Sequence, residues 1–288
     1  MKRIFGIAIL ACISIELPAQ QKQGYAFPPS YKSRSKGTTV IGHAQLEVIY
    51  ALNATDINDQ QTYIDLHVLR AGEQVSKHYS RFLELNDSLC DDFNRKNPHA
   101  LSRPWVTYLR TIGRRGDIWS EYQYTEIFTE NGQQTFYAWM PRYLEKYNGY
   151  YTEPACQQKW TLHADQKTII GYQCQRATCH WRGRDFEAWF TPEIPIRLGP
   201  WSFGGLPGLI LKINDTEGLY TWEAVGRRSG KFPVTKNAYE GFHSSSRDKI
   251  HKLQIAINRD YLKTSGAVDR KTGMRSSKET PYQPLEKE

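Results

Sequence analysis

Residues 204–210 read Gly-Gly-Leu-Pro-Gly-Leu-Ile, a combination of turn residues and the start of a buried strand. Proline followed by glycine predicts a tight turn, in which proline presets φ and Gly208 supplies a positive φ. After the turn, alternate apolar residues predict a core strand that runs to Ile213. No side chain here is suited to catalysis. We therefore interpret as a structural motif the residues Gly204, Gly205, Leu206, Pro207, Gly208, Leu209 and Ile210.

A long loop precedes this motif. Pro192 and Pro195 exclude a central strand, because proline cannot donate a ladder hydrogen bond. Long loops in compact domains are usually functional or disordered, and the aromatic residues of this one argue against disorder. If the protein binds a ligand, we expect contacts from this region, through Trp189, Glu193, Trp201 and Phe203.

Strand patterns dominate the rest of the chain. Apolar and polar residues alternate with period two, which is typical of half-buried antiparallel strands, at 45–52, 63–68, 170–174 and 185–190. Turn signals separate such segments, at Asn131-Gly132, Arg182-Gly183 and 215–218. Helical patterns are fewer: one short helix is predicted at 83–94, and a second at 247–261, where Ser244–Ser246 offer caps. The sequence therefore predicts a mainly β fold.

The N-terminus has the pattern of a secretory signal. Lys2 and Arg3 precede an apolar run, Phe5–Ile15, which is shorter than the ~20 residues needed to span a bilayer. We predict a signal peptide over 1–19 and export to the periplasm or the outer membrane. Two alternatives are a lipoprotein signal ending at Cys12 and a buried N-terminal helix or strand. We expect a flexible leader at 20–38, one β-rich domain at 39–263, and a polar tail at 264–288 that is ordered only in patches.

Export affects how the cysteines are interpreted. An even number remains after the signal, and one or two disulfides are plausible in an oxidising compartment, among Cys90, Cys156, Cys174 and Cys179. Cys174 and Cys179 are five residues apart, so on one strand they would face opposite sides and should not pair with each other. Buried free thiols are the alternative.

The formal net charge is +8, and the basic residues are scattered. No basic stripe with interleaved aromatic residues indicates nucleic-acid binding. Anionic lipid head groups or polysaccharide are more plausible partners, and a simple solvated surface is the alternative. Because no later segment is long and apolar enough to span a membrane, we expect membrane association to be peripheral at most.

Catalytic motifs are absent from the sequence: neither a Gly-x-Ser-x-Gly elbow nor a His-Glu-x-x-His pair occurs. We therefore predict no catalytic residue, no cofactor and no metal site. Two alternatives stay open. Glu193 and Asp185 could perform acid–base chemistry in an unfamiliar enzyme, and Cys179-His180 could hold a soft metal together with His163 or His78.

The order of several segments resembles the GLPGLI family of exported bacterial envelope proteins. The resemblance is close over Trp160–Gly218, and its main segments are 171–177, 182–184, 188–195 and 199–210. It extends weakly to 74–80 and to 281–286. In the first of these two segments, this chain has His78 in place of the family's usual phenylalanine. The resemblance implies an envelope protein of unestablished activity that works beside TonB-dependent outer-membrane transporters. It suits a strongly curved antiparallel half-barrel, like that of periplasmic lipoprotein carriers, with one or two helices.

From these observations we expect a non-enzymatic binding or accessory protein. Its partner would be a hydrophobic ligand or an outer-membrane transporter, and the sequence predicts no oligomeric state.

Overall fold

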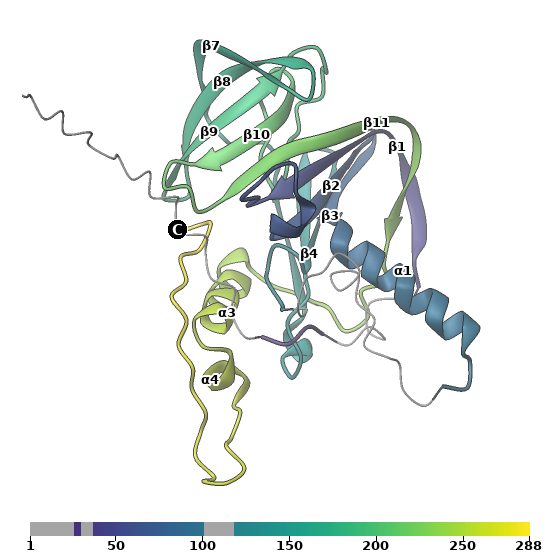
Figure 1. The fold of residues 1–288 in the computed structure, drawn as a ribbon, viewed down its shortest axis with the longest axis vertical. Coiled ribbons are helices and arrows are strands. Elements are labelled where there is room, and N and C mark those ends of the chain that lie inside the picture. The colour runs from purple at the N-terminus through teal and green to yellow at the C-terminus, as the bar shows by residue number, and fades with distance from the viewer. Residues whose placement is uncertain (1–25, 30–36, 101–117) are drawn as a thin grey trace, which may run out of the picture.

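A 12-stranded sheet forms the body of the protein (Figure 1). The structure, a computed structural model, describes residues 26–29, 37–100 and 118–288. The strands are β1 (Thr39–Leu52), β2 (Asp65–Ala71), β3 (Val75–Ser80), β4 (Thr125–Glu130), β5 (Gln133–Ala138), β6 (Gly149–Pro154), β7 (Thr161–Ile169), β8 (Tyr172–Trp181), β9 (Arg184–Thr191), β10 (Leu209–Asp215), β11 (Thr221–Lys236) and β12 (His243–Ser244).

The strand order is β12-β6-β5-β4-β3-β2-β1-β11-β10-β9-β8-β7. Every pair is antiparallel except β12 with β6, which is parallel. The predicted mainly β, antiparallel fold is confirmed. The predicted strongly curved half-barrel is wrong, because the sheet is neither closed nor strongly curled.

The sheet need not curl up, because other segments cover its apolar residues. Val48 and Tyr50 of β1 belong to a core that also takes in the loop after β9. On the other side of β1, Ala51 packs in a smaller cluster with Phe82 of the first helix. Loops and a helix thus bury surfaces that a closed barrel would bury against itself.

Two-residue turns close the predicted hairpins. Asn131 and Gly132 join β4 to β5, and Arg182 and Gly183 join β8 to β9. All four residues have a positive φ. This geometry matches the right-handed twist of paired strands, which is why such turns are favoured in hairpins. The predicted turns at 131–132 and 182–183 are confirmed.

Three α-helices lie in the described residues: α1 (Arg81–Lys96), α3 (Arg247–Arg259) and α4 (Tyr261–Ser265). Short 3-10 turns occur at η2 (Gln60–Thr62) and η3 (Glu145–Tyr147). Ser80 and Ser246 cap α1 and α3 by accepting hydrogen bonds from backbone amides of the first turn. Both predicted helices are confirmed, and α4 adds one that the sequence pattern did not predict. No helix in the described ranges is long and apolar enough to cross a membrane.

The signature turn differs from its prediction. Gly205 has a positive φ of 89°, whereas Gly208 is not among the residues with positive φ. Gly208 is instead needed for space, because a Cβ atom there would lie 2.1 Å from the carbonyl oxygen of Thr191. The strand after the turn is confirmed as β10, and Leu209 pairs with Thr191 of β9. Gly208 thus lets the two strands come together.

The predictions for the N-terminus cannot be compared with the fold. The signal peptide, Cys12 and most of the leader at 20–38 lie outside the described residues.

Candidate functional site

Three of the four predicted ligand residues lie in the core, namely Trp189, Trp201 and Phe203. Trp201 is buried, and its ring contacts those of Tyr122, Phe136 and Trp222 at centroid distances of 5.5–6.5 Å. Phe203 is also buried and packs against Phe186 at 4.8 Å. Both side chains therefore help to fix the long loop onto the sheet.

Trp189 belongs to the main core cluster, whereas Glu193 lies at the surface. The indole N–H of Trp189 donates to Glu187, and the ammonium group of Lys167 lies 4.0 Å from the centre of the Trp189 ring. Glu193 is exposed and accepts from the backbone N–H of Gln173. Asp185 is exposed in a pair with His180 at 2.7 Å. Glu193 and Asp185 thus have separate partners, which removes the geometric basis for pairing them in acid–base catalysis.

Cys179 and His180 also point apart. Cys179 is buried in the core, whereas His180 is exposed beside Asp185, as strand alternation requires. His78 lies in the core with both ring nitrogens unpartnered among the described residues, and burial, together with His67, holds its pKa well below the ordinary value. No group of three metal-ligating side chains occurs in the ranges that the structure describes.

Cys156, Cys174 and Cys179 are free thiols in the structure. The disulfides considered from the sequence stay a prediction.

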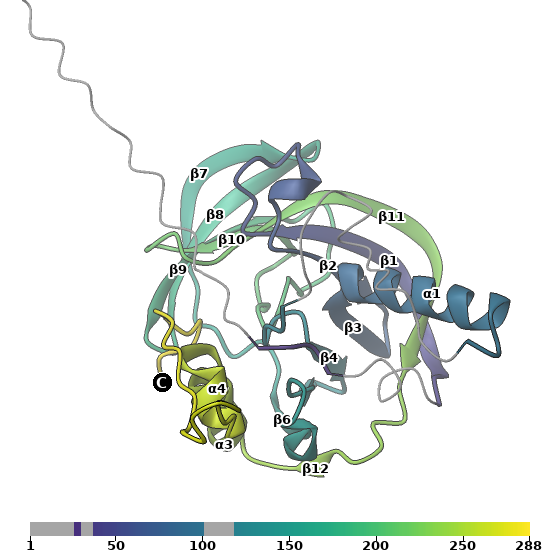
Figure 2. The ribbon, with the colours of Figure 1, turned by 60° about the horizontal axis from the view of Figure 1, so that its bottom comes forward.

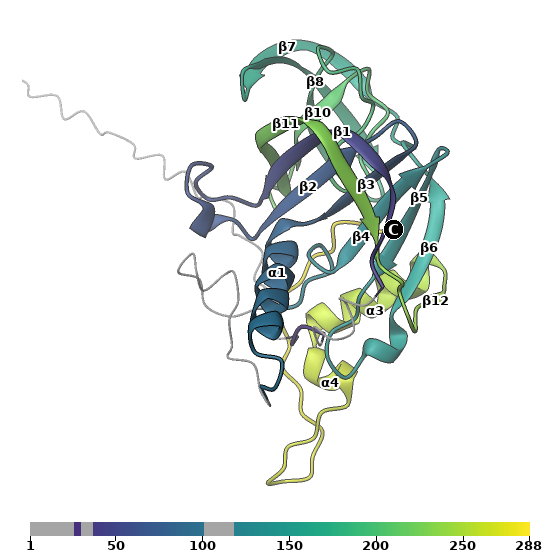
Figure 3. The same ribbon diagram turned by 90° about the vertical axis from the view of Figure 1, so that its right-hand side faces the viewer.

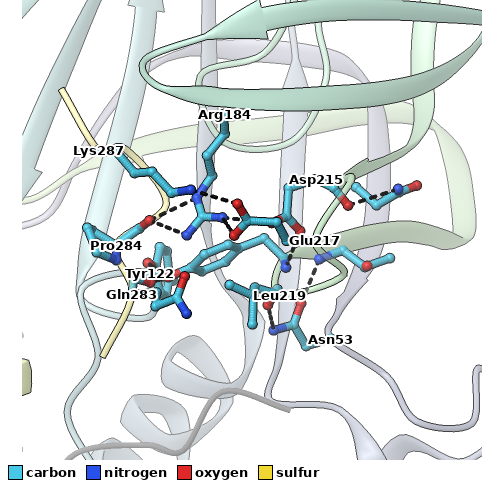
Figure 4. Close-up of polar contacts among 12 residues, drawn as sticks. Asn53, Tyr122, Arg184, Asp215, Glu217, Leu219, Gln283, Pro284 and Lys287 are labelled. Carbon is cyan, nitrogen blue, oxygen red and sulfur yellow. Dashed lines mark hydrogen bonds and ion pairs between the residues drawn. The ribbon is translucent and has the colours of Figure 1, made fainter. Parts of the chain in front are cut away.

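Polar contacts gather instead where the C-terminal tail crosses the β8–β9 and β10–β11 turns (Figure 4). The buried Arg184 guanidinium pairs with Asp215 at 2.9 Å and with Glu217 at 2.6 Å. Its other nitrogens donate to the carbonyl oxygen of Pro284 at 2.8 and 2.9 Å. One arginine thus joins the sheet to the tail.

The end of the tail is held as firmly. Glu286, nearly buried, accepts hydrogen bonds from Arg182 of the β8–β9 turn and Arg247 of α3. Leu285 beside it is buried in the main core cluster. Residues 264–288, which we expected to be ordered only in patches, therefore include a well-anchored segment at 280–287.

Tyrosine hydroxyls connect the same tail to a buried acid. Tyr122 donates to Tyr220 at 2.8 Å, and Tyr220 donates to the carbonyl of Gln283. Tyr282 donates to the buried carboxylate of Glu121, which also accepts from Asn258 of α3 at 2.8 Å. Burial raises the pKa of Glu121, although these hydrogen bonds act in the opposite direction.

This raised pKa predicts a pH dependence of stability. A carboxyl whose pKa is raised by folding stabilises the protein fully below its unfolded value of about 4.3, and that stability is lost as the pH rises through the folded value. Relative to the parent, Glu121→Gln should therefore gain unfolding free energy as the pH rises from about 4 to 7. Denaturant titrations at several pH values measure this slope.

Glu217→Gln is the matched control with the opposite sign. Hydrogen bonds from Lys287 and Arg184 lower the pKa of Glu217. Its amide variant should lose stability relative to the parent over the pH range in which the parent carboxyl ionises. If the unfolding free energies of the two variants, relative to the parent, changed equally with pH, the opposite pKa shifts of Glu121 and Glu217 would be contradicted.

A groove of about 1080 Å³ lies between α3, α4 and the anchored tail, and we call it the tail groove. Lys252, Ile255 and Arg259 of α3 and Lys263 of α4 line one side. The tail supplies the other side from Glu279 to Pro284, together with Lys287. Figure 2 shows how closely this segment follows the two helices.

Helical spacing gives α3 two distinct faces, one buried and one lining the tail groove. Ile250, Gln254 and Ile257 are buried on the sheet side. Lys252, Ile255 and Arg259 lie on a second stripe at intervals of three and four residues, which places them on one face. The spacing of the basic residues is the sequence signal for this second face of α3.

A second cleft, of about 200 Å³, lies between α1, β3 and β4. Two of its carboxylates have cationic partners, Glu84 with Arg81, and Glu126 with Lys77 at 2.8 Å. The tail groove is larger and has more free positive charge, so we take it as the candidate site.

Comparisons with known proteins address the signature region. A family model described as a protein of unknown function (Porph_ging) matches residues 182–212, which confirms the GLPGLI resemblance over that stretch. No curated protein matches the sequence. Two solved structures of PNGF-II, in space groups P21 and C2, match with TM-scores of 0.45 and 0.46 at 14% identity. Each match covers 75% of this chain and 34% or 33% of the PNGF-II chain, so this chain spans about a third of PNGF-II.

Proposed function

We propose that this chain, whose residues 182–212 match a family of unknown function, is a non-enzymatic binding component of the cell envelope. Its ligand would carry an anionic group and an apolar part, and the tail groove would hold it. The single observation that supports this most is the groove's combination of size, positive charge and apolar lining. Its volume of about 1080 Å³ lies just above the range of about 300–1,000 Å³ that is typical of small-molecule sites.

The charge balance in the groove favours an anion. Lys252, Arg259 and Lys263 have no ion-pair partner among the described residues, whereas Lys287 is paired with Glu217 at 2.7 Å. Of the acids, Asp260 already accepts from the Ser277 hydroxyl and from backbone amides. Glu279 is the remaining lining carboxylate. A phosphate or carboxylate would therefore meet net positive charge.

The apolar lining favours a hydrocarbon part beside the anion. Ile255 and Ala256 on the helix face Pro281 and Pro284 on the tail across the groove. Burying an alkyl chain contributes about 0.8 kcal/mol per methylene group, so even a short chain adds measurable affinity.

Export and a partner in the envelope complete the proposal. The signal-like N-terminus supports export to the periplasm or the outer membrane. The family resemblance supports a TonB-dependent transporter as the second partner. The enzymatic alternative finds little support, because Glu193 and Asp185 are exposed and have separate partners.

Octyl phosphate and octyl glucoside are the test ligands, since they share a chain and differ in charge. We expect octyl phosphate to bind the full chain and octyl glucoside to bind at least tenfold more weakly, as measured by isothermal titration calorimetry. The double variant Lys252→Gln, Arg259→Gln should lose about tenfold in affinity for octyl phosphate, roughly 1.4 kcal/mol.

Lys231→Gln removes an exposed charge from β11, outside the groove, and serves as the control. It should bind like the parent. Equal binding of both detergents, or equal loss in control and double variant, would contradict the proposed site.

A further inference from the structure

Exposed aromatic residues gather at the turn between β5 and β6. Tyr143 and Tyr147 have 71% and 49% of their surface exposed, and Lys146 lies over the Tyr147 ring at 5.0 Å. Phe27, 51% exposed, joins them: its carbonyl accepts from the Arg142 amide, and its ring lies 6.1 Å from that of Tyr261 in α4. Three rings are thus presented to solvent around one end of α4.

The loop that follows the other end of α4 adds exposed apolar side chains to the same part of the molecule. Val268 and Met274 are 53% and 66% exposed on a short hairpin that a bridge between Val268 and Arg275 holds together. Figures 1 and 3, viewed 90° apart, both place α4, this hairpin and the β5–β6 turn toward one end of the longest axis. Five of the nine exposed large hydrophobic residues in the described ranges therefore lie at this end.

Basic residues surround them. None of these has an ion-pair partner within the described part of the chain: Arg142, Lys146, Lys263, Arg270, Lys271 and Arg275. Glu145 and Asp269 are the acids on the same segments, so positive charge dominates. We call the three rings, the two hairpin side chains and these basic residues the aromatic-basic end.

Backbone strain marks the most exposed ring. The amide of Leu144 donates to the carbonyl of Pro141, so Tyr143 is the third residue of a four-residue turn. The φ angle of Tyr143 is 70°. Glycine adopts a positive φ at this turn position readily, whereas tyrosine does so at a cost in free energy. The turn therefore presents an aromatic ring to solvent where a glycine would be more stable.

We propose that the aromatic-basic end is a docking surface for an anionic lipid bilayer. Tyrosine rings are enriched at the head-group level of membranes, where an apolar body and a polar tip are both satisfied. Each lysine or arginine near an anionic leaflet contributes about 1 kcal/mol, a factor of about five in binding. The patch spreads over several separate segments, which suits mobile head groups better than one rigid partner.

Hydrogen exchange of the full chain with lipid vesicles tests the proposal locally. Vesicles of phosphatidylcholine mixed with phosphatidylglycerol should slow exchange at residues 139–148 and 262–277. Pure phosphatidylcholine should protect these segments much less, and added salt should reduce the protection. Unchanged exchange at both segments on anionic vesicles would overturn the proposal, even if the apolar run at 5–15 tethers the chain.

Variants separate docking from folding. Tyr143→Gly should raise thermal stability because it relieves the turn. The double variant Tyr143→Gly, Tyr147→Ser should nevertheless bind anionic vesicles more weakly than the parent, because it lacks two rings suited to the head-group level. Leu162→Ser is the control, because Leu162 is 50% exposed on β7 at the other end of the molecule (Figure 1). Equal vesicle binding by the double variant and the parent would count against docking at this end, as would an equal loss in the control.

Discussion

Replacing Gly208 by valine should destabilise the fold by about 3 kcal/mol or more, because overpacking against backbone cannot be relieved by a rotamer change. A Cβ atom at Gly208 would lie 2.1 Å from the Thr191 carbonyl oxygen and 2.9 Å from the Cα atom of Pro192. Both contacts are with backbone at the point where β9 and β10 pair. Thermal melting should fall by roughly 6–12 °C.

Gly226→Val is the matched control for that substitution. Gly226 lies in β11, has no positive φ, and an added Cβ atom there meets nothing within 4 Å. Valine suits an extended strand, so stability should change by no more than about 0.5 kcal/mol or rise slightly. If the two variants had the same melting temperature, close approach of β9 and β10 would not explain why glycine is needed at position 208.

Arg184→Ala should cost about 3–5 kcal/mol, the range for breaking one partner out of a buried ion pair. It leaves the buried Asp215 carboxylate without its cation and the Pro284 carbonyl without either donor. Arg184→Lys should recover only part of the loss, because an ammonium group cannot reproduce the planar fork that spans both partners. Denaturant unfolding measures both costs, and hydrogen exchange at 280–287 should rise as the tail loosens.

A surface pair on the neighbouring strand supplies the control. Arg176 pairs with Asp165 at 2.8 Å, but the two side chains are 27% and 56% exposed. Arg176→Ala should therefore cost at most about 1 kcal/mol. The double variant Arg184→Ala, Asp215→Ala should be less destabilised than the two single variants added together. If the two single losses of unfolding free energy simply added in the double variant, Arg184 and Asp215 would not be energetically coupled.

Features set by neighbouring residues were predictable from the sequence. Asn131-Gly132 and Arg182-Gly183 define their hairpins because positive φ at both turn positions is a local requirement. The cap of α3 follows from Ser246 for the same reason. Such signals need no knowledge of what lies across the fold.

Features that depend on distant segments were not predictable in this way. β1 pairs with β11, so that Leu52 lies opposite Trp222, and no local pattern encodes that partner. Gly208 was assigned a turn role, whereas its actual constraint is the backbone of Thr191. The tail was expected to be ordered only in patches because it is polar. Its anchoring could not be predicted, because Arg182 and Arg247, the partners of Glu286, lie far away in the sequence.

The same separation explains why the tail groove was missed. One of its walls is a helix face and the other is a segment that becomes a wall only when Arg184 and Tyr220 bind its carbonyl groups. Trp201 and Phe203 were predicted to contact a ligand because they are aromatic residues in a loop. Sequence alone does not distinguish such residues from aromatic residues that pack in the core, where both lie.

The anchored tail also sets the order in which the protein can mature. Leu285 fills part of the main core, and Glu286 neutralises charge from Arg182 and Arg247. Neither contact can form until residue 286 has been synthesised. Before residues 284–286 are made, the core therefore lacks Leu285, and Arg184 can pair with Asp215 and Glu217 but not with the Pro284 carbonyl. The core around Leu285 is therefore completed only after the strands that it packs against have been made.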